Sequence, residues 1–197
     1  MKNIAIFASG TGSNATRIME HFRNHDNIQV ALVVSNKPKA PVLETARQFA
    51  IPTLVIQRQD FYQTENILAD LAQHQIDFIA LAGFLWLIPP YLIRHFERKM
   101  VNIHPALLPK YGGKGMYGQH VHQAVWQAKE QESGMTIHFV NEQYDEGAIL
   151  FQASCAVLPH HTPEDIARQV LQLEHQYFAK VIEAVLSGQS MPNLTLN

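Results

Sequence analysis

The sequence predicts an α/β fold built on a mostly parallel sheet with helices on both faces. In the first half of the 197-residue chain, short and continuously apolar segments alternate with longer amphipathic ones. Strands that are covered on both faces are apolar throughout, so the short segments are expected to be parallel strands. The second half contains two further strand-like segments and then one long amphipathic segment. These predict C-terminal antiparallel strands and a long final helix.

Each element of the first half follows from this pattern. Strands are expected at residues 4–8, 30–34, 53–56 and 78–82. Helices are expected between them at residues 14–22, 41–49 and 60–74, the last capped by Asp60. Strand–helix alternation connects parallel strands by right-handed crossovers, in a Rossmann-like arrangement. Ligands bind such sheets beyond the carboxyl ends of the strands, so the loops there are expected to carry the site.

The second half begins with a short extended segment at residues 101–103. A glycine-rich stretch at residues 112–118 predicts a mobile loop. Strands are expected at residues 135–140 and 149–157, and a helix at residues 163–186, where Thr162 and Pro163 form a good start signal. Residues 188–197 are expected to form a loosely held tail.

Composition excludes several classes of function. The chain has 15 lysine and arginine residues and 17 acidic residues, for a net charge of −2. This balance provides no excess of positive charge with which to bind nucleic acid. The longest apolar stretch, residues 78–88, is too short to span a bilayer. Cys155 is the only cysteine, and the N-terminus lacks a signal-peptide pattern. We therefore expect a cytoplasmic protein with neither a nucleic-acid partner nor a membrane span.

The first candidate site is the loop at residues 9–14, whose residues are Ser9, Gly10, Thr11, Gly12, Ser13 and Asn14. It joins a predicted strand to a predicted helix. Its glycines let the backbone approach a phosphate, to which helix N–H groups and the Ser13 hydroxyl can donate. It matches neither a full dinucleotide fingerprint nor a P-loop with its lysine, so a phosphate monoester is favoured. The alternative is a simple tight turn and helix cap.

The second candidate site combines Asn102, His104 and Asp145. In an extended segment Asn102 and His104 point the same way. An amide donor beside an imidazole suits a developing oxyanion and a proton transfer. Asp145, in a turn between two predicted strands, is placed to orient His104 and raise its pKa. The alternatives are that His104 only forms hydrogen bonds to the backbone at the end of a strand, and that Asp145 is an ordinary acidic residue of a turn.

No metal site is expected. His120 and His122 begin a predicted helix, and positions two apart on a helix do not share a face. No third ligand has the spacing for zinc. Cys155 lies in a predicted strand and is interpreted as a small core residue rather than a nucleophile.

Together these segments resemble the phosphoribosylglycinamide formyltransferases, the folate-dependent enzymes of purine synthesis within the formyltransferase superfamily. The resemblance runs from Asn3 to about Leu186. It is carried by six markers in this order: the loop at residues 9–14, Ser35-Asn36-Lys37, Leu81-Ala82-Gly83-Phe84, Asn102-Ile103-His104-Pro105 with residues 107–111, His138-Phe139-Val140 and Asp145-Glu146-Gly147.

The resemblance implies a single formyltransferase domain over residues 1–197. Its substrate-phosphate half is expected at about residues 1–100, its catalytic and folate half at about 101–187, and its tail at 188–197. It assigns catalysis to Asn102, His104 and Asp145, with His138 in a supporting position. The substrate contacts are expected at Gly10, Thr11, Gly12, Ser13, Asn14 and, for the ribose, Glu174. The folate contacts are expected at Phe84, Leu85, Trp86, Leu87, Ile88, Val140 and Asn141.

The implied reaction moves a formyl group from 10-formyltetrahydrofolate, a co-substrate, to the amine of glycinamide ribonucleotide on the route to IMP. Asn102 is expected to donate to the oxyanion, with a protonated His104 helped by Asp145. Asp145 alternatively accepts the amine's surplus proton through a water. Neither a metal nor a covalent intermediate is needed. The partners are these small molecules, and the chain is expected to be a monomer or a homodimer.

The sequence departs from the family at Trp86, where many members carry arginine, and at Thr11, where asparagine is common. No arginine aligns near Thr64, where some members contact the folate tail. Formyltetrahydrofolate hydrolases and sugar-amine formyltransferases share the catalytic trio but usually carry additional segments. A non-catalytic module that binds folate or a nucleotide on the same scaffold is the alternative outside catalysis.

Overall fold

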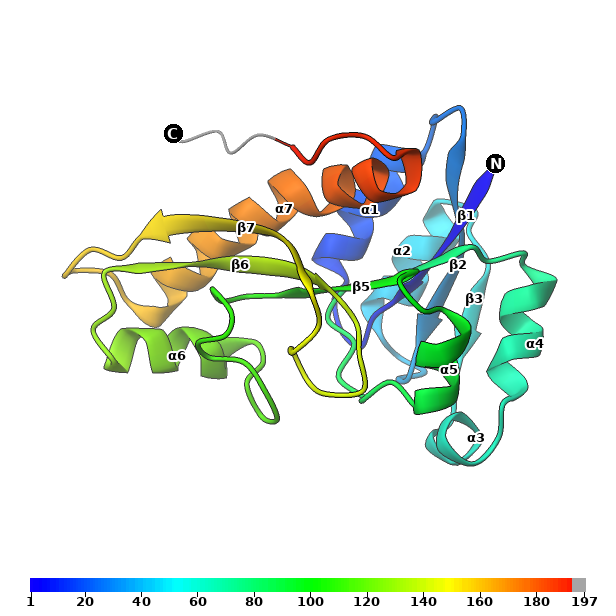
Figure 1. Cartoon of the computed structure of the whole chain (residues 1–197), viewed down its shortest axis with the longest axis horizontal. Helices are drawn as coiled ribbons and strands as arrows, with labels where there is room; N and C mark the ends of the chain where they lie inside the picture. Colours follow the sequence, from blue (N-terminus) through cyan, green and yellow to red (C-terminus); the bar gives the residue numbers. More distant parts are fainter. Residues whose placement is uncertain (193–197) are drawn as a thin grey trace. The chain divides into compact units, whose positions relative to one another are not determined.

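The computed structural model describes residues 1–192 (Figure 1). Its contacts divide the chain into two compact units, Met1–Val101 and the part from Asn102 onward. The strands that it describes form one sheet in the order β3-β2-β1-β4-β5-β6-β7. The predicted fold class is confirmed: an α/β fold with a mostly parallel sheet, C-terminal antiparallel strands and a long final helix. The single-domain assignment stays a prediction.

The first unit alternates strands and helices. Its strands are β1 (Lys2–Phe7), β2 (Ile28–Ser35), β3 (Thr53–Val55) and β4 (Phe78–Leu81). Its helices are α1 (Ser13–Phe22), α2 (Pro41–Gln48), α3 (Arg58–Gln63), α4 (Asn66–Gln73) and α5 (Pro90–His95). β1 pairs in parallel with β2 and β4, and β2 with β3. Every residue of β4 is buried, as is every residue of β1 after Lys2, which explains why these segments are apolar throughout.

The prediction of one helix over residues 60–74 is wrong, because the chain breaks there into α3 and α4. Thr64 has an extended backbone (φ −132°, ψ 172°). Its hydroxyl donates to the Asp60 carbonyl at 2.8 Å and accepts from the Asn66 N–H at 3.3 Å. Such local side-chain bonds compete with helix continuation. Asp60 is also not a cap, since Gln57 precedes the first residue of α3.

The second unit contains β5 (Met100–His104), whose first two residues belong to the first unit, α6 (Gln119–Gln127), β6 (Glu132–Phe139), β7 (Ile149–Ala156) and α7 (Pro163–Ser187). β6 and β7 are antiparallel, as predicted. Thr162 and Asp165 form a capping box at the start of α7, and Gly188 ends the helix with φ 65°. The predicted tail at residues 188–197 lies partly outside the described residues.

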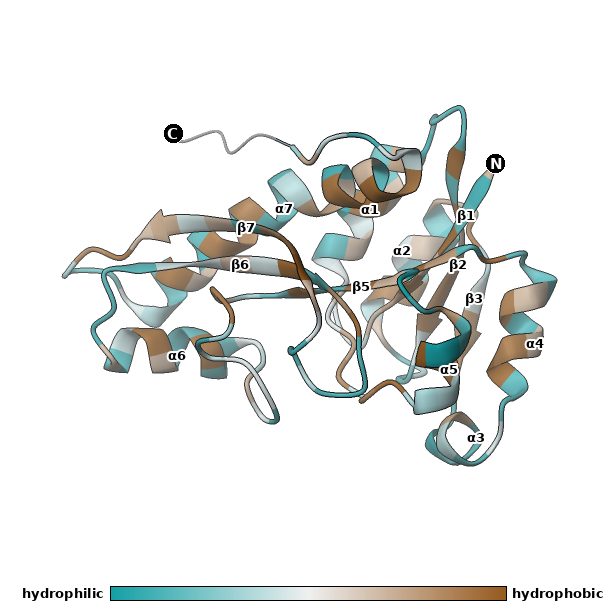
Figure 2. Ribbon diagram, viewed as in Figure 1, coloured by the Kyte–Doolittle hydropathy of each residue, from teal (hydrophilic) through white to brown (hydrophobic). Residues whose placement is uncertain are grey.

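The core of the second unit forms where α7 packs against β6, β7 and α6. Figure 2 shows hydrophobic and hydrophilic residues alternating around α7. Its buried side includes Val170, Tyr177, Phe178, Val181 and Ile182. Fully burying an apolar side chain of this size contributes about 1.5–3 kcal/mol. Among the described residues, no helix is both long and apolar enough to cross a membrane.

Candidate active site

Three predicted catalytic side chains meet in the second unit. Asn102 and His104 lie two residues apart on β5, so their side chains leave the same face of the strand. Asp145 lies in the loop between β6 and β7. Its Oδ1 accepts from Asn102 Nδ2 at 3.4 Å, and its Oδ2 lies 3.5 Å from His104 Nδ1. The Asp145 carboxylate therefore contacts both the Asn102 amide and the His104 imidazole.

His138 from β6 belongs to the same cluster. Its Nδ1 donates to the Phe139 carbonyl at 2.8 Å, which leaves Nε2 as an acceptor. Asn102 Nδ2 donates to this Nε2 at 3.1 Å. His138 thus holds one amide N–H of Asn102, while the longer contact with Asp145 takes the other. The orientation of the amide is fixed from two sides.

Tyr111 determines which nitrogen of His104 carries a proton. His104 Nε2 donates to the Tyr111 carbonyl at 2.8 Å, so in the neutral ring Nδ1 carries the lone pair and faces Asp145. This contact has no signature in the sequence, because its acceptor is a backbone atom. Tyr111 and Asp145 both have φ 57°, in the left-handed region. Such a conformation costs a bulky residue about 1–3 kcal/mol and persists only where its surroundings hold it.

Burial dominates the electrostatics of His104, whose side chain is 4% exposed. Desolvation lowers its pKa below 6.5, although Asp145 and the Tyr111 carbonyl both act to raise it. Asp145 thus acts on the pKa of His104 in the expected direction, but burial outweighs it and the net pKa is lowered. Burial also acts to raise the pKa of Asp145, but His138, His104 and the Gly113 N–H outweigh it and hold that pKa below 3.8. The resting pair is a neutral imidazole beside a carboxylate.

The predicted phosphate loop lies in the first unit, between β1 and α1. Gly12 precedes the first residue of α1 with φ 75°, and Thr16 N–H donates to its carbonyl at 2.8 Å. A Cβ at Gly12 would lie 2.3 Å from Val42 Cγ2, so only glycine fits this close approach to α2. Gly10 and Thr11 are exposed, whereas Ser13 is half-buried and Asn14 is buried. The loop presents the N-terminal N–H groups of a ten-residue helix.

The predicted folate stretch also belongs to the first unit and follows β4. Leu85 N–H donates to the Ser9 hydroxyl at 3.0 Å, which ties this stretch to the phosphate loop. Leu85 is 44% exposed, Trp86 and Leu87 are half-buried, and Phe84 and Ile88 are buried. The guanidinium of Arg58 lies 5.2 Å from the ring centre of Tyr62 and 5.6 Å from that of Trp86. Arg58 was not among the predicted site residues, because no local motif marks a cation stacked on distant aromatics.

The remaining predicted residues lie in the second unit. Glu174, the residue expected to contact the ribose, is buried on α7, where it is 7% exposed. Val140 and Asn141 begin the loop that carries Asp145, and Asn141 Oδ1 accepts from Gln143 N–H at 3.1 Å. His120 is exposed and His122 is buried, so the two do not share a face of α6. No group of three or more His, Cys, Asp or Glu side chains is placed to hold a metal ion among residues 1–192.

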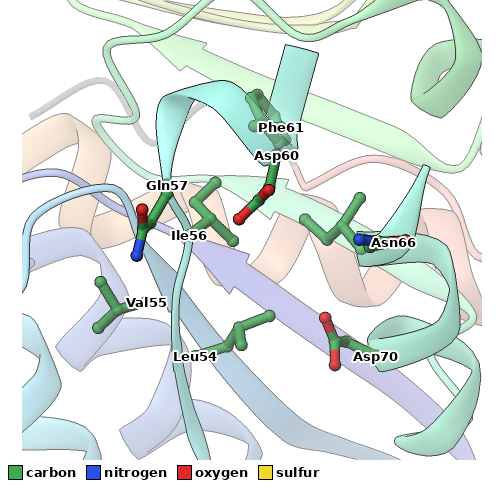
Figure 3. Close-up of a pocket in the computed structure, with 9 residues that line it drawn as sticks. Leu54, Val55, Ile56, Gln57, Asp60, Phe61, Asn66 and Asp70 are labelled. Atoms are coloured by element: carbon green, nitrogen blue, oxygen red, sulfur yellow. The ribbon is translucent and has the colours of Figure 1, made fainter. Parts of the chain in front are cut away.

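A separate hollow in the first unit lies between β3, α3 and α4 (Figure 3). It is lined by Leu54, Val55, Ile56, Gln57, Asp60, Phe61, Asn66, Ile67 and Asp70. The figure shows the Asp60 and Asp70 side chains beside apolar ones such as Ile56 and Leu54, in a hollow with both polar and apolar walls. None of the lining residues is a predicted site residue, and we assign the hollow no role.

Comparisons with known proteins identify the family of the chain. Residues 2–182 match the family model described as formyl transferase. Over 93% of this chain, the sequence is 42% identical to the chloroplastic phosphoribosylglycinamide formyltransferase of Arabidopsis thaliana, and it spans 65% of that protein's length. It is 34% identical to the phosphoribosylglycinamide formyltransferase of Bacillus subtilis, over 94% of this chain and 95% of that one.

A solved structure supports the same relationship. Glycinamide ribonucleotide transformylase 1 from Geobacillus kaustophilus superposes with a TM-score of 0.85 at 35% identity, covering 94% of this chain and 99% of that one. The family model and the bacterial relative both extend over nearly all of the described residues. The chain belongs to the formyl transferase family.

Proposed function

We propose that the chain transfers the formyl group of 10-formyltetrahydrofolate to the primary amine of glycinamide ribonucleotide, a step of purine synthesis. The observation that carries the proposal is the cluster of Asn102, His104 and Asp145 in a member of this family. An amide donor can stabilise the oxyanion of acyl transfer to an amine, and an imidazole beside a carboxylate can move the proton. The name shared by its relatives supports the choice of acceptor.

The acceptor's phosphate is assigned to the loop before α1. This loop combines an exposed Gly10 with the positive end of the α1 dipole. The buried carboxylate of Glu174 is assigned to the ribose hydroxyls, for which a carboxylate is a natural acceptor.

The amine nitrogen attacks the formyl carbon, and the carbonyl oxygen becomes an oxyanion. Asn102 donates to that oxyanion with the N–H that otherwise makes the longer, 3.4 Å contact with Asp145. His138 keeps the second N–H, so the amide does not have to reorient. A donor placed in this way lowers the barrier by about 3–4 kcal/mol.

His104 carries the proton. Its Nδ1 lone pair accepts a proton from the attacking nitrogen, and Asp145 and the Tyr111 carbonyl stabilise the resulting imidazolium. The same proton then passes to N10 of the folate as the bond from the formyl carbon to N10 breaks. Because the pKa of Asp145 is held low, Asp145 stays ionised and is a poorer base than His104.

The folate is assigned to residues 84–88 and to the Val140–Asn141 end of the catalytic loop. Residues 84–88 offer the exposed apolar side chain of Leu85 beside the half-buried Trp86 and Leu87. Trp86 stands where many family members carry arginine, and the nearby Arg58 guanidinium supplies a cation. Arg58 has no acidic partner within salt-bridge distance in the described part of the chain, so its charge is available for the glutamate carboxylates of the folate tail.

Location and assembly belong to the same proposal. Cys155 is the only cysteine of the chain, which fits a reducing compartment such as the cytoplasm. The reaction as proposed requires neither a metal nor a second copy of the chain.

The test is an absorbance assay of folate product with 10-formyltetrahydrofolate and β-glycinamide ribonucleotide, beside a control without amine. Fast turnover that requires the ribonucleotide supports the proposal. Equal turnover without amine identifies a hydrolase instead. Absence of turnover in both reactions contradicts the proposal, and sugar amines would then be tried as acceptors.

A further inference from the structure

We propose that Glu130 is a positioning residue for His104 and acts through Tyr111, an inference that rests on the proposed function and deepens it. Glu130 lies in the turn between α6 and β6. The Tyr111 hydroxyl donates to Glu130 Oε1 at 2.9 Å, while the Tyr111 carbonyl accepts from His104 Nε2 at 2.8 Å. One residue therefore connects a carboxylate outside the cluster to the imidazole inside it.

The backbone of Tyr111 explains why an anchor is needed. A bulky residue rarely adopts φ 57°, yet this conformation is the one that directs the carbonyl at His104. Glu130 is an ionised acceptor with a side chain that is only 25% exposed, so its bond to the hydroxyl is charge-assisted and partly shielded from water. We call the Tyr111–Glu130 contact the pin.

The pin controls the tautomer of His104. With the carbonyl in place, the proton of the neutral ring stays on Nε2, and Nδ1 is available as a base. Without it, the proton is drawn to Nδ1, where it donates to Asp145 Oδ2 across the present 3.5 Å separation. In that tautomer Nδ1 has no lone pair for the attacking amine. The same loop also holds Asp145, because Gly113 N–H donates to its Oδ2 at 2.9 Å.

The experiment compares Tyr111→Phe and Glu130→Ala with two matched variants. Glu130→Gln keeps an oxygen acceptor for the Tyr111 hydroxyl. Lys110→Met removes the other partner of Glu130 Oε1, a lysine that is 68% exposed and outside the pin. Steady-state kinetics and the ¹⁵N NMR shifts of the His104 ring, assigned by their loss in His104→Gln, are measured for each.

We expect Tyr111→Phe and Glu130→Ala to lower kcat by about ten-fold or more with little change in KM, because a misplaced catalytic group costs this much or more. The ¹⁵N shifts of His104 should move toward the Nδ1–H form in both variants. Lys110→Met should match the wild type in kcat and in tautomer, and Glu130→Gln should retain most of kcat.

Unchanged kcat and tautomer in folded pin variants would overturn the inference. A loss of kcat with an unchanged His104 tautomer would also overturn it, because the pin would then support the fold without positioning the imidazole. If Glu130→Ala does not fold, Tyr111→Phe carries the same test by removing one oxygen atom. The NMR measurement needs no substrate, so a tautomer shift supports the pin even if the formyl-transfer assay fails.

Discussion

Nδ1 of His104 lies 3.5 Å from Oδ2 of Asp145, while the other ring nitrogen is already bonded to the Tyr111 carbonyl. The imidazole therefore faces the carboxylate with its lone pair and not with its N–H. Because burial keeps the pKa of His104 below 6.5, this neutral form dominates near pH 7.

Replacing Asp145 by asparagine tests the proton transfer. The side chain keeps its size, but the charge that stabilises the imidazolium is lost, so kcat should fall about a hundred-fold or more. His104 works as a neutral base, so kcat/KM falls as the pH drops through its pKa. The wild-type midpoint should lie below pH 6.5, and in Asp145→Asn it should lie lower still, since Asp145 acts to raise that pKa. Near-wild-type turnover in a folded variant removes Asp145 from the mechanism.

Removing the amide of Asn102 tests the oxyanion contact. Asn102→Ala should lower kcat by about 10²–10³, because an oxyanion donor acts mainly in the transition state. KM for either substrate should change little. The exposed Asn27 provides a matched control, and Asn27→Ala should keep full activity. A drop in binding with unchanged kcat in Asn102→Ala would argue against the oxyanion role.

The free energy of unfolding should decrease as the pH is lowered, because of His122. This side chain is 6% exposed, and its Nδ1 has no hydrogen-bond partner within residues 1–192. Burial, and secondarily His104, lower its pKa to about 4. The unfolded chain binds a proton near pH 6.5 and the folded chain does not, so stability is complete above pH 6.5 and is lost as the pH falls toward 4.

Urea unfolding at pH 7 and pH 5 measures this effect. His122 alone should reduce the free energy of unfolding by about 2 kcal/mol over that interval. His122→Leu should remove most of that loss, whereas the exposed His120→Gln should leave it in place. The same pH dependence in His122→Leu would show that other groups cause it.

Within the phosphate loop, an alanine substitution should destabilise the protein at Gly12 but not at Gly10. Gly12→Ala places a Cβ 2.3 Å from Val42 Cγ2 at φ 75°, so it should cost at least about 1 kcal/mol of stability and raise KM for the ribonucleotide. Gly10→Ala meets nothing within 4 Å and should leave stability unchanged. Thermal melts and KM values compare the two variants. Equal stability of both variants would contradict the packing argument.

Arg58 should matter for the folate tail. Arg58→Ala should raise KM for polyglutamylated 10-formyltetrahydrofolate by about ten-fold, since a charged hydrogen bond at an exposed site contributes at the low end of its range. Arg47→Ala, which removes an exposed arginine paired with Glu44, is the matched control. An unchanged KM in Arg58→Ala would place the tail elsewhere.

The sequence was most informative where a residue pattern reflects a single physical requirement. Strands buried on both faces must be apolar throughout, so β1 and β4 could be identified within one or two residues. The period of two along an extended strand predicted that Asn102 and His104 share one face, as they do on β5. The start of α7 followed from Thr162 and Pro163, whose capping chemistry is local.

The features that could not be predicted depend on tertiary contacts or on competing effects. The break at Thr64 depends on one hydroxyl bonded in both directions, which periodicity does not reveal. The Tyr111 carbonyl has no sequence signature, because every residue carries one. The pKa of His104 depends on whether burial or Asp145 has the larger effect, and only the structure shows how deeply the ring is buried.

The central claim is formyl transfer to the amine of glycinamide ribonucleotide, and isotope labelling tests it most directly. The protein is incubated with 10-[¹³C]formyltetrahydrofolate and β-glycinamide ribonucleotide, and ¹³C NMR follows the label. We predict that the label appears as a formamide on the ribonucleotide in wild-type protein and is strongly delayed in His104→Ala. Label released as free formate, or label that stays on the folate, would contradict the account.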